Sequence, residues 1–367
     1  PALLATVQSP RRAFDRFHRI DALDDAGAAA LIQAQEIDVL VDLHGLTARA
    51  RPDIVARGAA PLQVAFLGFP GPSALPHVDY VVADAFIFPD ELRAGFTEAP
   101  LRLPTVFQCS DSQRPIGPLP SRAQLGLPQD RFVFCAFNNN FKFTPEVFEV
   151  WMRVLRRVPD AVLWLLEDNP WARSNLVQAA QAHGVDAGRL VFAPRVMPAD
   201  YLARFTAADL FLDTCPYNAG TTASDALWAG LPLLTLAGRT YVSRMAGSLL
   251  KSAGLDELVT HSLADYERVA VEMATDSARL RRLRERLAAE KSAGRLFSTP
   301  RFAREFEDAL RAALRADATV PAGPVATAVP GKSGRSGAGG ARGGRGAGGA
   351  GGAGGAGGRR HGPRASA

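Results

Sequence analysis

The stretch with the clearest chemical potential is residues 212–230, LDTCPYNAGTTASDALWAG. It opens with apolar residues typical of a short buried strand, and it passes through Pro216, Asn218 and Gly220, which interrupt regular structure. Thr221 and Thr222 then stand at a predicted helix start. The free N–H groups and the positive dipole end of such a helix attract anions. The stretch therefore predicts a phosphate site, and the alternative is an ordinary capped helix.

Other polar residues follow the ends of neighbouring predicted strands. Asp225 stands one turn into the same helix and can accept hydrogen bonds from sugar hydroxyls, so the expected ligand is a phosphate joined to a ribose or another sugar. Asn139 and Lys142 follow the strand at residues 131–137, and Lys142 supplies a mobile positive charge suited to phosphate.

A third loop carries Arg195, Val196 and Tyr201, and the Tyr201 ring can stack on a nucleobase. Each of these residues also has a plain structural interpretation, as a surface lysine, a turn asparagine or a half-buried helix tyrosine. The functional interpretation rests on their shared position at strand ends, where open α/β sheets bind ligands.

Known sequence motifs do not indicate another type of nucleotide or metal site. The folded part contains neither G-x-x-x-x-G-K-[ST] nor G-x-G-x-x-G, and it has no His, Asp and Glu cluster at metal-binding spacing. We therefore expect no metal and no cofactor. Among the histidines, His44 is the best functional candidate, because it lies in the loop after the first predicted strand.

The elements expected around these loops alternate between strand and helix. In the second half, strands are predicted at residues 131–137, 161–167, 190–194, 210–213 and 231–236, with helices between them. In the first half, strands are predicted at residues 37–43, 62–68 and 79–84, with a fourth at 101–107. This alternation predicts parallel, doubly wound sheets with all strand-to-helix loops on one edge.

Composition divides the chain into regions. We expect an N-terminal lobe at residues 1–109, a Pro-rich linker at 110–129, a C-terminal lobe at 130–295 and a final helix at 296–316. Residues 317–367 are rich in Gly, Ala and Arg and cannot bury enough apolar surface to fold, so this tail is predicted to be disordered. A chain that begins with Pro1 is expected to be a fragment with a partial N-terminal lobe and, for that reason, no transfer activity of its own.

Charge and cysteine content narrow the class of protein. The net charge of +5 includes the basic tail, so we do not expect the folded part to bind nucleic acid. The 3 cysteines are widely spaced without a disulfide pattern, which favours a reducing compartment, the cytoplasm. No apolar run approaches the length of a membrane span, so no membrane association is expected.

Three blocks of this sequence resemble the catalytic region of the protein O-linked N-acetylglucosamine transferases, including the bacterial members and the Spindly-type enzymes. They are DLHGLTARARPDIVARGAAPLQVAFLGFPG with the DYVVAD after it, FVFCAFNNNFKFTPEVFEVWMRVLRRVPDAVLWLLE, and RLVFAPRVMPADYLARFTAADLFLDTCPYNAGTTASDALWAGLPLLT. The resemblance covers about residues 20–314. It implies a GT-B architecture of two Rossmann-like lobes, a UDP-sugar donor, a polypeptide acceptor, no metal, and tetratricopeptide repeats upstream.

The resemblance also implies roles for individual residues of the C-terminal lobe. Thr221 and Thr222 would hold the diphosphate, and Lys142, with Asn139 beside it, would neutralise charge on the departing UDP. Further roles follow for the nucleoside: Asp225 would take the ribose, and the backbone near Val196, with Arg204, would recognise uracil.

The sugar pocket is implied on the N-terminal side. It would be lined by Thr47, Leu67, Gly68 and Pro70, with Phe141 facing them. The sequence departs from the family pattern at Tyr201 and Gly220, where the family carries His, so base stacking would use a different ring and one sugar contact at Gly220 is in doubt. The family's N-terminal lobe also begins earlier, with a strand and a His-bearing loop, and a search for a 34-residue repeat finds none here.

These observations predict a glycosyltransferase that moves N-acetylglucosamine, or a related sugar, from UDP to Ser or Thr of proteins. Lys142 and the helix at Thr221 would stabilise the leaving diphosphate. The general base is not assigned, and His44 is the first candidate within this chain. Two alternatives stay open: a UDP-sugar-binding module without catalysis, and a GT-B-like nucleotide-sugar epimerase.

Overall fold

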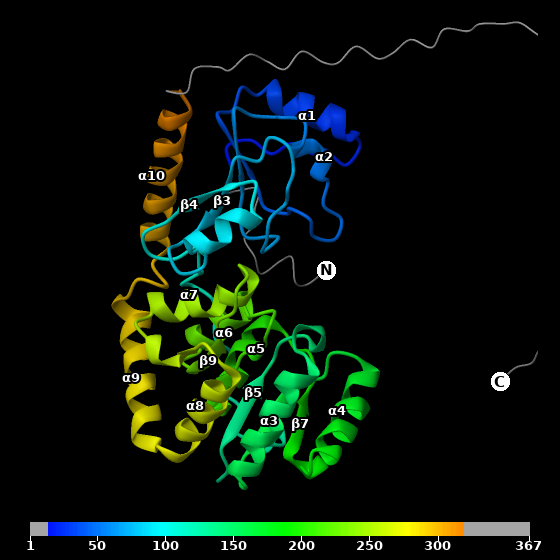
Figure 1. The fold of residues 1–367 in the computed structure, drawn as a ribbon, viewed down its shortest axis with the longest axis vertical. Coiled ribbons are helices and arrows are strands. Elements are labelled where there is room, and N and C mark those ends of the chain that lie inside the picture. Colours follow the sequence, from blue (N-terminus) through cyan, green and yellow to red (C-terminus); the bar gives the residue numbers. More distant parts are fainter. Residues whose placement is uncertain (1–13, 319–367) are drawn as a thin grey trace, which may run out of the picture. The chain divides into compact units, whose positions relative to one another are not determined.

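A computed structural model describes residues 14–318 of the chain (Figure 1). The described residues contain two separate parallel β-sheets, one of four strands and one of six. We refer to the elements from α1 to β4 as the N-lobe and to those from β5 to α9 as the C-lobe. Residues 319–367 of the predicted disordered tail lie outside the described residues, so that prediction stays untested.

The N-lobe sheet has the strand order β1-β2-β3-β4, and every neighbouring pair is parallel. Its buried positions are apolar, as in Leu62 and Val64 of β2 and Val82 of β3. Two short helices precede and follow the first strand, and Asp24 caps α1 by accepting from the N–H of Gly27. The elements are α1 (Asp25–Gln33), β1 (Val39–Asp42), α2 (Pro52–Val55), β2 (Leu62–Ala65), β3 (Tyr80–Ala83) and β4 (Ala99–Arg102).

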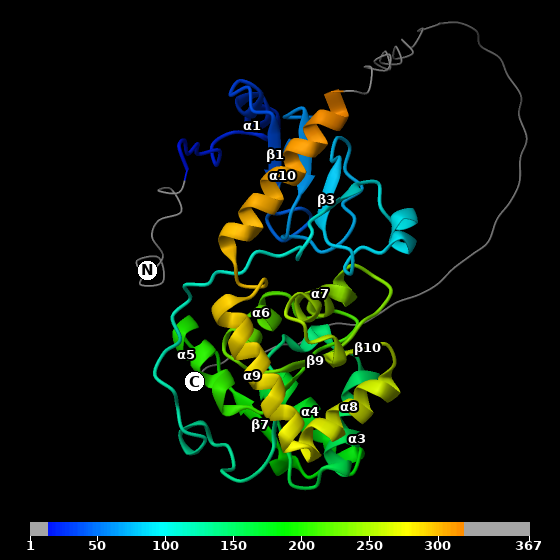
Figure 2. The same cartoon turned by 90° about the vertical axis from the view of Figure 1, so that its left-hand side faces the viewer.

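The last helix, α10 (Thr299–Ala318), packs on the N-lobe sheet although it follows the C-lobe in sequence (Figure 2). Phe66 stacks on Phe302 and Phe306, with ring centroids 5.9 and 5.5 Å away. Glu305 accepts hydrogen bonds from the N–H and the hydroxyl of Thr105. The chain therefore returns to its first sheet, and α10 supplies apolar surface that covers one face of it.

The C-lobe sheet has the order β10-β9-β8-β5-β6-β7, with all strands parallel. From β5 the chain adds β6 and β7 on one side of the sheet, and from β8 it adds β9 and β10 on the other side. The order in which strands are added therefore reverses between the central strands β5 and β8. In open α/β sheets the crevice outside the carboxyl ends of such a pair is the usual ligand site. The strands are β5 (Val133–Ala136), β6 (Val162–Leu166), β7 (Leu190–Ala193), β8 (Leu210–Leu212), β9 (Leu233–Leu236) and β10 (Val259–Thr260).

Helices connect these strands and bury one apolar face each. In α3, the buried face includes Val147, Trp151 and Leu155, spaced four residues apart, while Arg156 and Arg157 lie in the last turn where cations favour the helix dipole. The helices are α3 (Pro145–Arg157), α4 (Pro170–Ala182), α5 (Pro198–Arg204), α6 (Thr221–Trp228), α7 (Met245–Ser252), α8 (Leu263–Thr275) and α9 (Ser277–Ala293).

The predicted fold class, an α/β protein with two parallel sheets, is confirmed. Two details differ from the sequence prediction. The fourth N-lobe strand is Ala99–Arg102, whereas the prediction was 101–107, so the two share only Leu101 and Arg102. A sixth C-lobe strand, Val259–Thr260, was missed because two residues carry too little pattern to detect.

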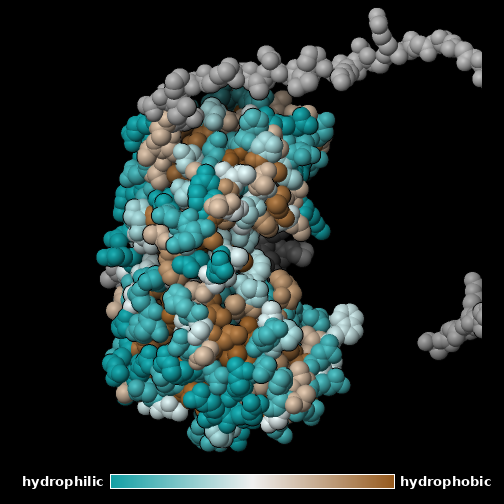
Figure 3. Space-filling model, viewed as in Figure 1, coloured by the Kyte–Doolittle hydropathy of each residue, from teal (hydrophilic) through white to brown (hydrophobic). Residues whose placement is uncertain are grey.

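On the face shown in Figure 3, hydrophilic residues predominate and apolar residues appear in small groups. The large apolar side chains, such as Trp151, Trp164 and Phe211, are fully buried in the C-lobe core. Among the described residues, none of the helices combines the length and the apolar character needed to cross a membrane.

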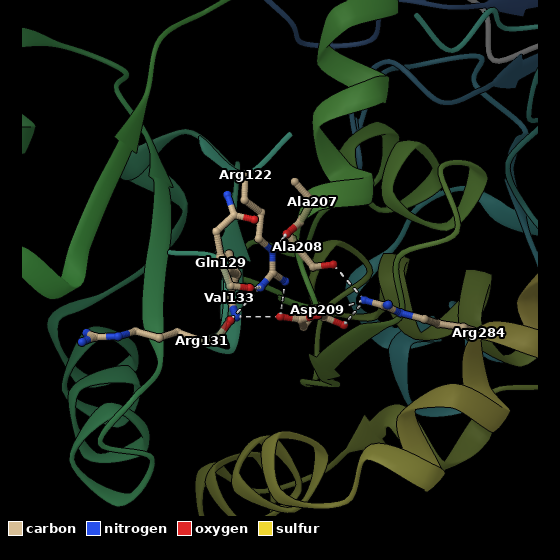
Figure 4. Close-up of polar contacts among 8 residues, drawn as sticks. All are labelled: Arg122, Gln129, Arg131, Val133, Ala207, Ala208, Asp209 and Arg284. Atoms are coloured by element: carbon tan, nitrogen blue, oxygen red, sulfur yellow. Dashed lines mark hydrogen bonds and ion pairs between the residues drawn. The ribbon is translucent and has the colours of Figure 1, made fainter. Parts of the chain in front are cut away.

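The predicted linker, residues 110–129, is hydrogen-bonded to the C-lobe through Arg122 (Figure 4). The Arg122 guanidinium donates to the Asp209 carboxylate at 2.7 Å and to the carbonyl oxygens of Ala207 and Arg131. Asp209 also accepts from the N–H of Val133 at 2.8 Å, and Arg284 of α9 reaches its other oxygen at 3.3 Å. One carboxylate thus fixes the start of β5, the start of β8, the linker and α9.

Replacing this carboxylate should destabilise the C-lobe. Asp209→Ala leaves the N–H of Val133 and the Arg122 guanidinium without their shared acceptor, and the side chain is only 17% exposed. We expect a loss of about 2 kcal/mol or more, seen as a melting temperature several degrees lower in a thermal unfolding experiment. The control is Glu307→Ala, which removes an exposed ion pair with Arg311 on α10. Equal melting temperatures for the two variants would contradict the role given to Asp209.

Candidate functional site

A cavity of about 500 Å³ lies at the carboxyl-end edge of the C-lobe sheet. Its walls come from the loops after β5 and β7, from the last residue of β6 and from the first turns of α5 and α6. The position agrees with the strand order, because β5 and β8 form the central pair at which the chain changes direction. The lining residues are Phe137, Asn138, Asn139, Lys142, Leu166, Arg195, Val196, Pro198, Tyr201, Thr222 and Asp225.

The helix α6 begins at Thr221, within one residue of the predicted start, and Gly220 is its N-cap. Thr222 lines the cavity, whereas Thr221 is exposed at the first helical position and is not on the wall. Gly220 is buried, and a β-carbon there would overlap the end of the Met245 side chain. Met245 therefore fills the space that a larger residue at position 220 would need, so a side chain could enter only if Met245 moved.

Lys142 ends a short 3₁₀ turn, Asn140–Lys142, directly after β5. Its ammonium lies 4.3 Å from the centroid of the Tyr217 ring, in the loop that precedes α6. Burial lowers the pKa of Lys142, and the nearby Asp213 carboxylate opposes that shift. An ammonium held in this partly desolvated position gains more from an incoming anion than a surface lysine does.

Asp213 lies behind the cavity, at the end of β8, and is 1% exposed. It accepts hydrogen bonds from the N–H groups of Thr214 and Ala219, both at 2.8 Å, and from the Thr235 hydroxyl at 2.6 Å. Asn138 donates to it at 3.3 Å. Burial nevertheless raises the pKa of Asp213 to about 7. The carboxylate therefore holds the loop before α6 in shape rather than facing a ligand.

The loops after β5, β6 and β7 are joined at the mouth of the cavity. Arg195 donates to Asp168 at 2.6 Å and to the side-chain oxygen of Asn139 at 2.9 Å. Asp168 also accepts from the N–H of Asn140 at 3.3 Å. This network fixes the side chain of Asn139 and the backbone that presents Val196, two residues that the sequence placed in the site.

Tyr201 and Arg204 lie on α5 but occupy different environments. Tyr201 lines the cavity, and its ring packs against Phe205 at 4.9 Å, so one aromatic wall is available for a flat ligand. Arg204 is 4% exposed and is not on the wall; its guanidinium donates to the carbonyl of Pro194 at 2.7 Å. Arg204 thus supports the loop before Val196 from behind.

Asp225 lines the cavity from the first turns of α6, and Arg114 holds it there. The guanidinium forms an ion pair with the Asp225 carboxylate and also donates to the Ser224 hydroxyl at 3.2 Å. Burial raises the pKa of Asp225 to about 6, and Arg114 opposes that rise. Arg114 belongs to residues 110–129, so this segment contacts a residue of the cavity wall, Asp225, without lining the cavity itself.

The predicted N-lobe residues gather at the carboxyl-end edge of the first sheet. A β-carbon on Gly68 would overlap the carbonyl of Leu43, so the loops after β1 and β2 pack backbone against backbone. Leu67, with φ +68°, is exposed beside Gly68, and Pro70 follows in the same loop. Thr47 lies 3.4 Å from the Nδ1 atom of His44, from hydroxyl to ring.

His44 and Phe141 lie away from the C-lobe cavity wall. His44 instead lines an N-lobe cavity of about 600 Å³ together with apolar residues such as Ile20 and Ile54. Phe141 is 72% exposed and contacts Tyr217 edge to face, with centroids 6.3 Å apart. Within residues 14–318, no three His, Cys, Asp or Glu side chains are grouped so that they could hold a metal ion.

Sequence reasoning missed several residues of the site. Asn138 lines the cavity, and its Oδ1 atom is buried without a hydrogen-bond partner among the described residues. The run of three asparagines after β5 gave no signal to prefer one of them. Arg114 and Asp213 were also missed: the first lay in a predicted linker, and the second was taken only as the end of a strand.

The cavity wall combines four chemical features. It holds a desolvated ammonium, a helix N-terminus, a carboxylate that can accept from hydroxyls, and an aromatic side wall. The first two suit phosphate groups, the third suits a ribose, and the fourth suits a base. Together they fit a nucleoside diphosphate.

Comparison with known proteins supports this chemistry. The family model for glycosyl transferase family 41 matches residues 11–119 and 109–306. A probable UDP-N-acetylglucosamine–peptide N-acetylglucosaminyltransferase SEC of Arabidopsis thaliana is 34% identical over 300 residues, covering 80% of this chain and 31% of the relative. The corresponding SPINDLY protein of the same plant is 31% identical over 300 residues, covering 80% and 32%.

Two solved structures are also similar to this chain. A lysine-to-methionine mutant of the Thermobaculum terrenum O-GlcNAc transferase aligns with a TM-score of 0.78 and 32% identity, covering 84% of this chain and 59% of that one. A sucrose-phosphate synthase of Thermosynechococcus elongatus shares the fold, with a TM-score of 0.55 and 15% identity, covering 83% and 82%.

The two parallel sheets thus have the GT-B architecture of glycosyltransferases. The chain spans about a third of the length of the curated relatives that it matches. The family model covers most of the chain and includes every residue of the C-lobe cavity. The chain therefore belongs to glycosyl transferase family 41.

Proposed function

We propose that this chain is the catalytic region of a protein O-glycosyltransferase that moves N-acetylglucosamine, or a related sugar, from a UDP donor to Ser or Thr of a polypeptide. The observation that carries the proposal is the C-lobe cavity, in which Lys142, Thr222 and Asp225 share one wall at the central pair of strands. The named relatives, described as peptide N-acetylglucosaminyltransferases, support the choice of sugar and acceptor.

The proposed reaction is a displacement at the anomeric carbon. The acceptor hydroxyl forms the new C–O bond while the bond between that carbon and the β-phosphate oxygen breaks, and UDP leaves with the negative charge. Lys142 and the N–H groups at the start of α6 would stabilise that charge, which is electrostatic catalysis by a preorganised site. Thr221 and Thr222 would add hydroxyl donors.

Each remaining residue has a proposed role in donor binding. Asp225 would accept from the ribose hydroxyls, Tyr201 would pack against the base, and the backbone at Val196 would recognise uracil with Arg204 behind it. Asn139 would lie beside the diphosphate. Thr47, Leu67, Gly68, Pro70, Phe141 and Gly220 are proposed for the sugar. His44 remains the first candidate for the general base within this chain.

The alternatives differ in chemistry. A nucleotide-sugar epimerase would need carboxylates near the sugar, and Asp225 is the one carboxylate among the described residues on the cavity wall. A binding module without catalysis would keep UDP affinity and lack transfer. An assay that follows both the free sugar nucleotide and a serine-containing peptide separates the three, because only the transferase links sugar to the peptide.

We further propose that the full protein carries tetratricopeptide repeats upstream, which would bind the acceptor polypeptide, and that it works in the cytoplasm. The second proposal is supported by Cys109, Cys135 and Cys215, which are free thiols in the structure.

UDP should bind without a divalent cation. The cavity offers Lys142 and a helix N-terminus as its anion-binding groups, so phosphate charge does not require a metal for neutralisation. We expect a micromolar dissociation constant, about −7 to −8 kcal/mol, measured by calorimetry in EDTA. GDP and ADP serve as controls for recognition of the base. Equal affinity for all three nucleotides, or binding only after a metal is added, would contradict the prediction.

Lys142 should act mainly on the transition state. Lys142→Ala removes the ammonium that meets the leaving diphosphate, so kcat in the full-length protein should fall by about two orders of magnitude or more. The matched control is Lys251→Ala on α7, where the ammonium pairs with Asp256 at 2.5 Å, outside the cavity. Steady-state transfer to a peptide provides the measurement. Turnover of Lys142→Ala at the level of the control would remove Lys142 from the mechanism.

A further inference from the structure

Residues 110–117 pack along α6 at several points. The hydroxyls of Ser110 and Ser224 lie 2.9 Å apart, and Trp228 donates from its indole N–H to the carbonyl of Arg114 at 3.1 Å. The N–H of Gly117 donates to the carbonyl of Ala199 at 3.0 Å, at the start of α5. This part of the segment is therefore fixed to the two helices that border the cavity.

Arg114 is the residue of this segment that contacts Asp225 on the cavity wall. Its guanidinium ion-pairs with Asp225 and donates to Ser224, while its Nε donates to the carbonyl of Asp111 at 2.9 Å. The guanidinium also lies over the Trp228 ring, 5.6 Å from the centroid. The Arg114 and Asp225 side chains are 19% and 15% exposed, so the pair is largely shielded from water. All these contacts restrict the guanidinium to one position.

The consequence for Asp225 is geometric. One carboxylate oxygen, Oδ1, accepts from Arg114, and Asp225 is one of the residues that line the cavity. A carboxylate held by a fixed guanidinium keeps its orientation, and it stays ionised more readily than burial alone would permit. Both properties are needed for a carboxylate that accepts hydrogen bonds from a vicinal diol.

We propose that Arg114 is a positioning residue for donor binding: it holds the Asp225 carboxylate so that it can accept hydrogen bonds from the ribose hydroxyls of the nucleotide. This inference rests on the proposed function, since it takes the cavity to bind UDP. It adds that ribose recognition depends on the segment that joins the two lobes and not on the C-lobe alone.

The charged and titratable groups around Asp225 come from three elements besides its own helix. Arg114 comes from the joining segment and Tyr201 from α5, and burial raises the pKa of Tyr201, so its hydroxyl stays neutral. The ammonium of Lys291 on α9 lies 4.1 Å from the Trp228 ring centroid, and burial and the positive charge of Arg114 lower its pKa. Lys291 makes no ion pair with Asp225 in the described structure. Arg114 is thus the cation that compensates the Asp225 charge.

The test compares UDP with 2′,3′-dideoxy-UDP, which lacks the hydroxyls, by calorimetry on the chain as it exists. For Arg114→Met we expect the dissociation constant of UDP to rise about tenfold, the size of one charge-assisted hydrogen bond, while that of the dideoxy nucleotide changes less than about threefold. Arg114→Lys should retain part of the UDP affinity that Arg114→Met loses. Lys291→Met, which removes the other cation over Trp228, should leave the ratio of the two constants unchanged.

The pH profile gives a second measure. The ratio of the two dissociation constants cancels the titration of the phosphates, which both nucleotides share. In the unmodified chain, UDP should bind more tightly than the dideoxy nucleotide above pH 6. This difference in affinity should be lost as the pH falls through about 6, where Asp225 becomes protonated. In Arg114→Met, the loss should occur at higher pH, because the guanidinium that favours the ionised form is gone.

Several results would overturn the inference. If Arg114→Met weakened the binding of both nucleotides equally, Arg114 would act on the phosphates or on the fold and not on the ribose. If the binding of neither nucleotide weakened, Arg114 would have no role in donor binding. Additive effects of Arg114→Met and Asp225→Asn on UDP affinity would show that Arg114 does not act through Asp225. If Arg114→Met unfolds, as judged by its melting temperature, the comparison rests on Arg114→Lys. Failure of the unmodified chain to bind UDP would instead refute the proposed function itself.

Discussion

The candidate site depends on one buried carboxylate, that of Asp213. It receives hydrogen bonds from the loop after β5 through Asn138, from the loop before α6 through Thr214 and Ala219, and from β9 through Thr235. These donors come from three neighbouring strand ends, so a single charge sets the relative position of the walls. Burial disfavours the ionised form of this carboxyl group and raises the pKa of Asp213 to about 7.

That pKa determines how the interaction responds to pH. The folded pKa of Asp213 lies above the ordinary value of about 3.9 for an unfolded chain, so the folded state favours the protonated form. The stability that this preference contributes is complete below about pH 4 and is lost as the pH rises through about 7. Near neutral pH the site therefore retains its shape through the four donors and the nearby ammonium of Lys142 rather than through proton uptake.

The two lobes share structure beyond the joining segment. The Tyr241 hydroxyl donates to the carbonyl of Val82 at 2.7 Å, Arg244 donates to the carbonyl of Phe86 at 2.7 Å, and Ser248 is hydrogen-bonded to Asp84. The Asp84 carboxylate is 5% exposed and also accepts from the N–H of Phe107. The end of the N-lobe sheet is thus bonded to the elements that follow β9, and the apolar core of the C-lobe extends to Val81, Ile87 and Phe107.

Local patterns in the sequence predicted much of this molecule. The apolar runs located nine of the ten strands in the described residues, and the residues around Thr222 located the start of α6 to within one residue, because both patterns depend on neighbours in the chain. The expected hydroxyl cap was wrong, since the N-cap of α6 is Gly220. The strand order β10-β9-β8-β5-β6-β7 depends on pairing between distant segments and could not be predicted in that way. The same holds for Arg114, since its partner Asp225 is 111 residues away, and its own surroundings are rich in proline and typical of a linker. Arg204 illustrates the opposite case, because its position on α5 was correct but its side chain is directed away from the cavity to Pro194.

The distribution of charge on the cavity wall explains why an anion is the ligand that the site favours. Two cations are on that wall, Lys142 and Arg195, and Arg195 is already paired with Asp168 at 2.6 Å. Lys142 makes no ion pair within 4 Å of its ammonium with any described residue, and the Asp213 carboxylate, which opposes the lowering of its pKa, accepts hydrogen bonds from other groups. Burial lowers the pKa of Lys142 because it disfavours the charged form, and an arriving phosphate favours the charged form in a medium where water screens poorly. The carboxylate of Asp225, in contrast, is neutralised by Arg114 and does not repel that phosphate. The site thus presents one ammonium without an ion-pair partner among the described residues, beside a helix N-terminus, which is an arrangement suited to a leaving diphosphate.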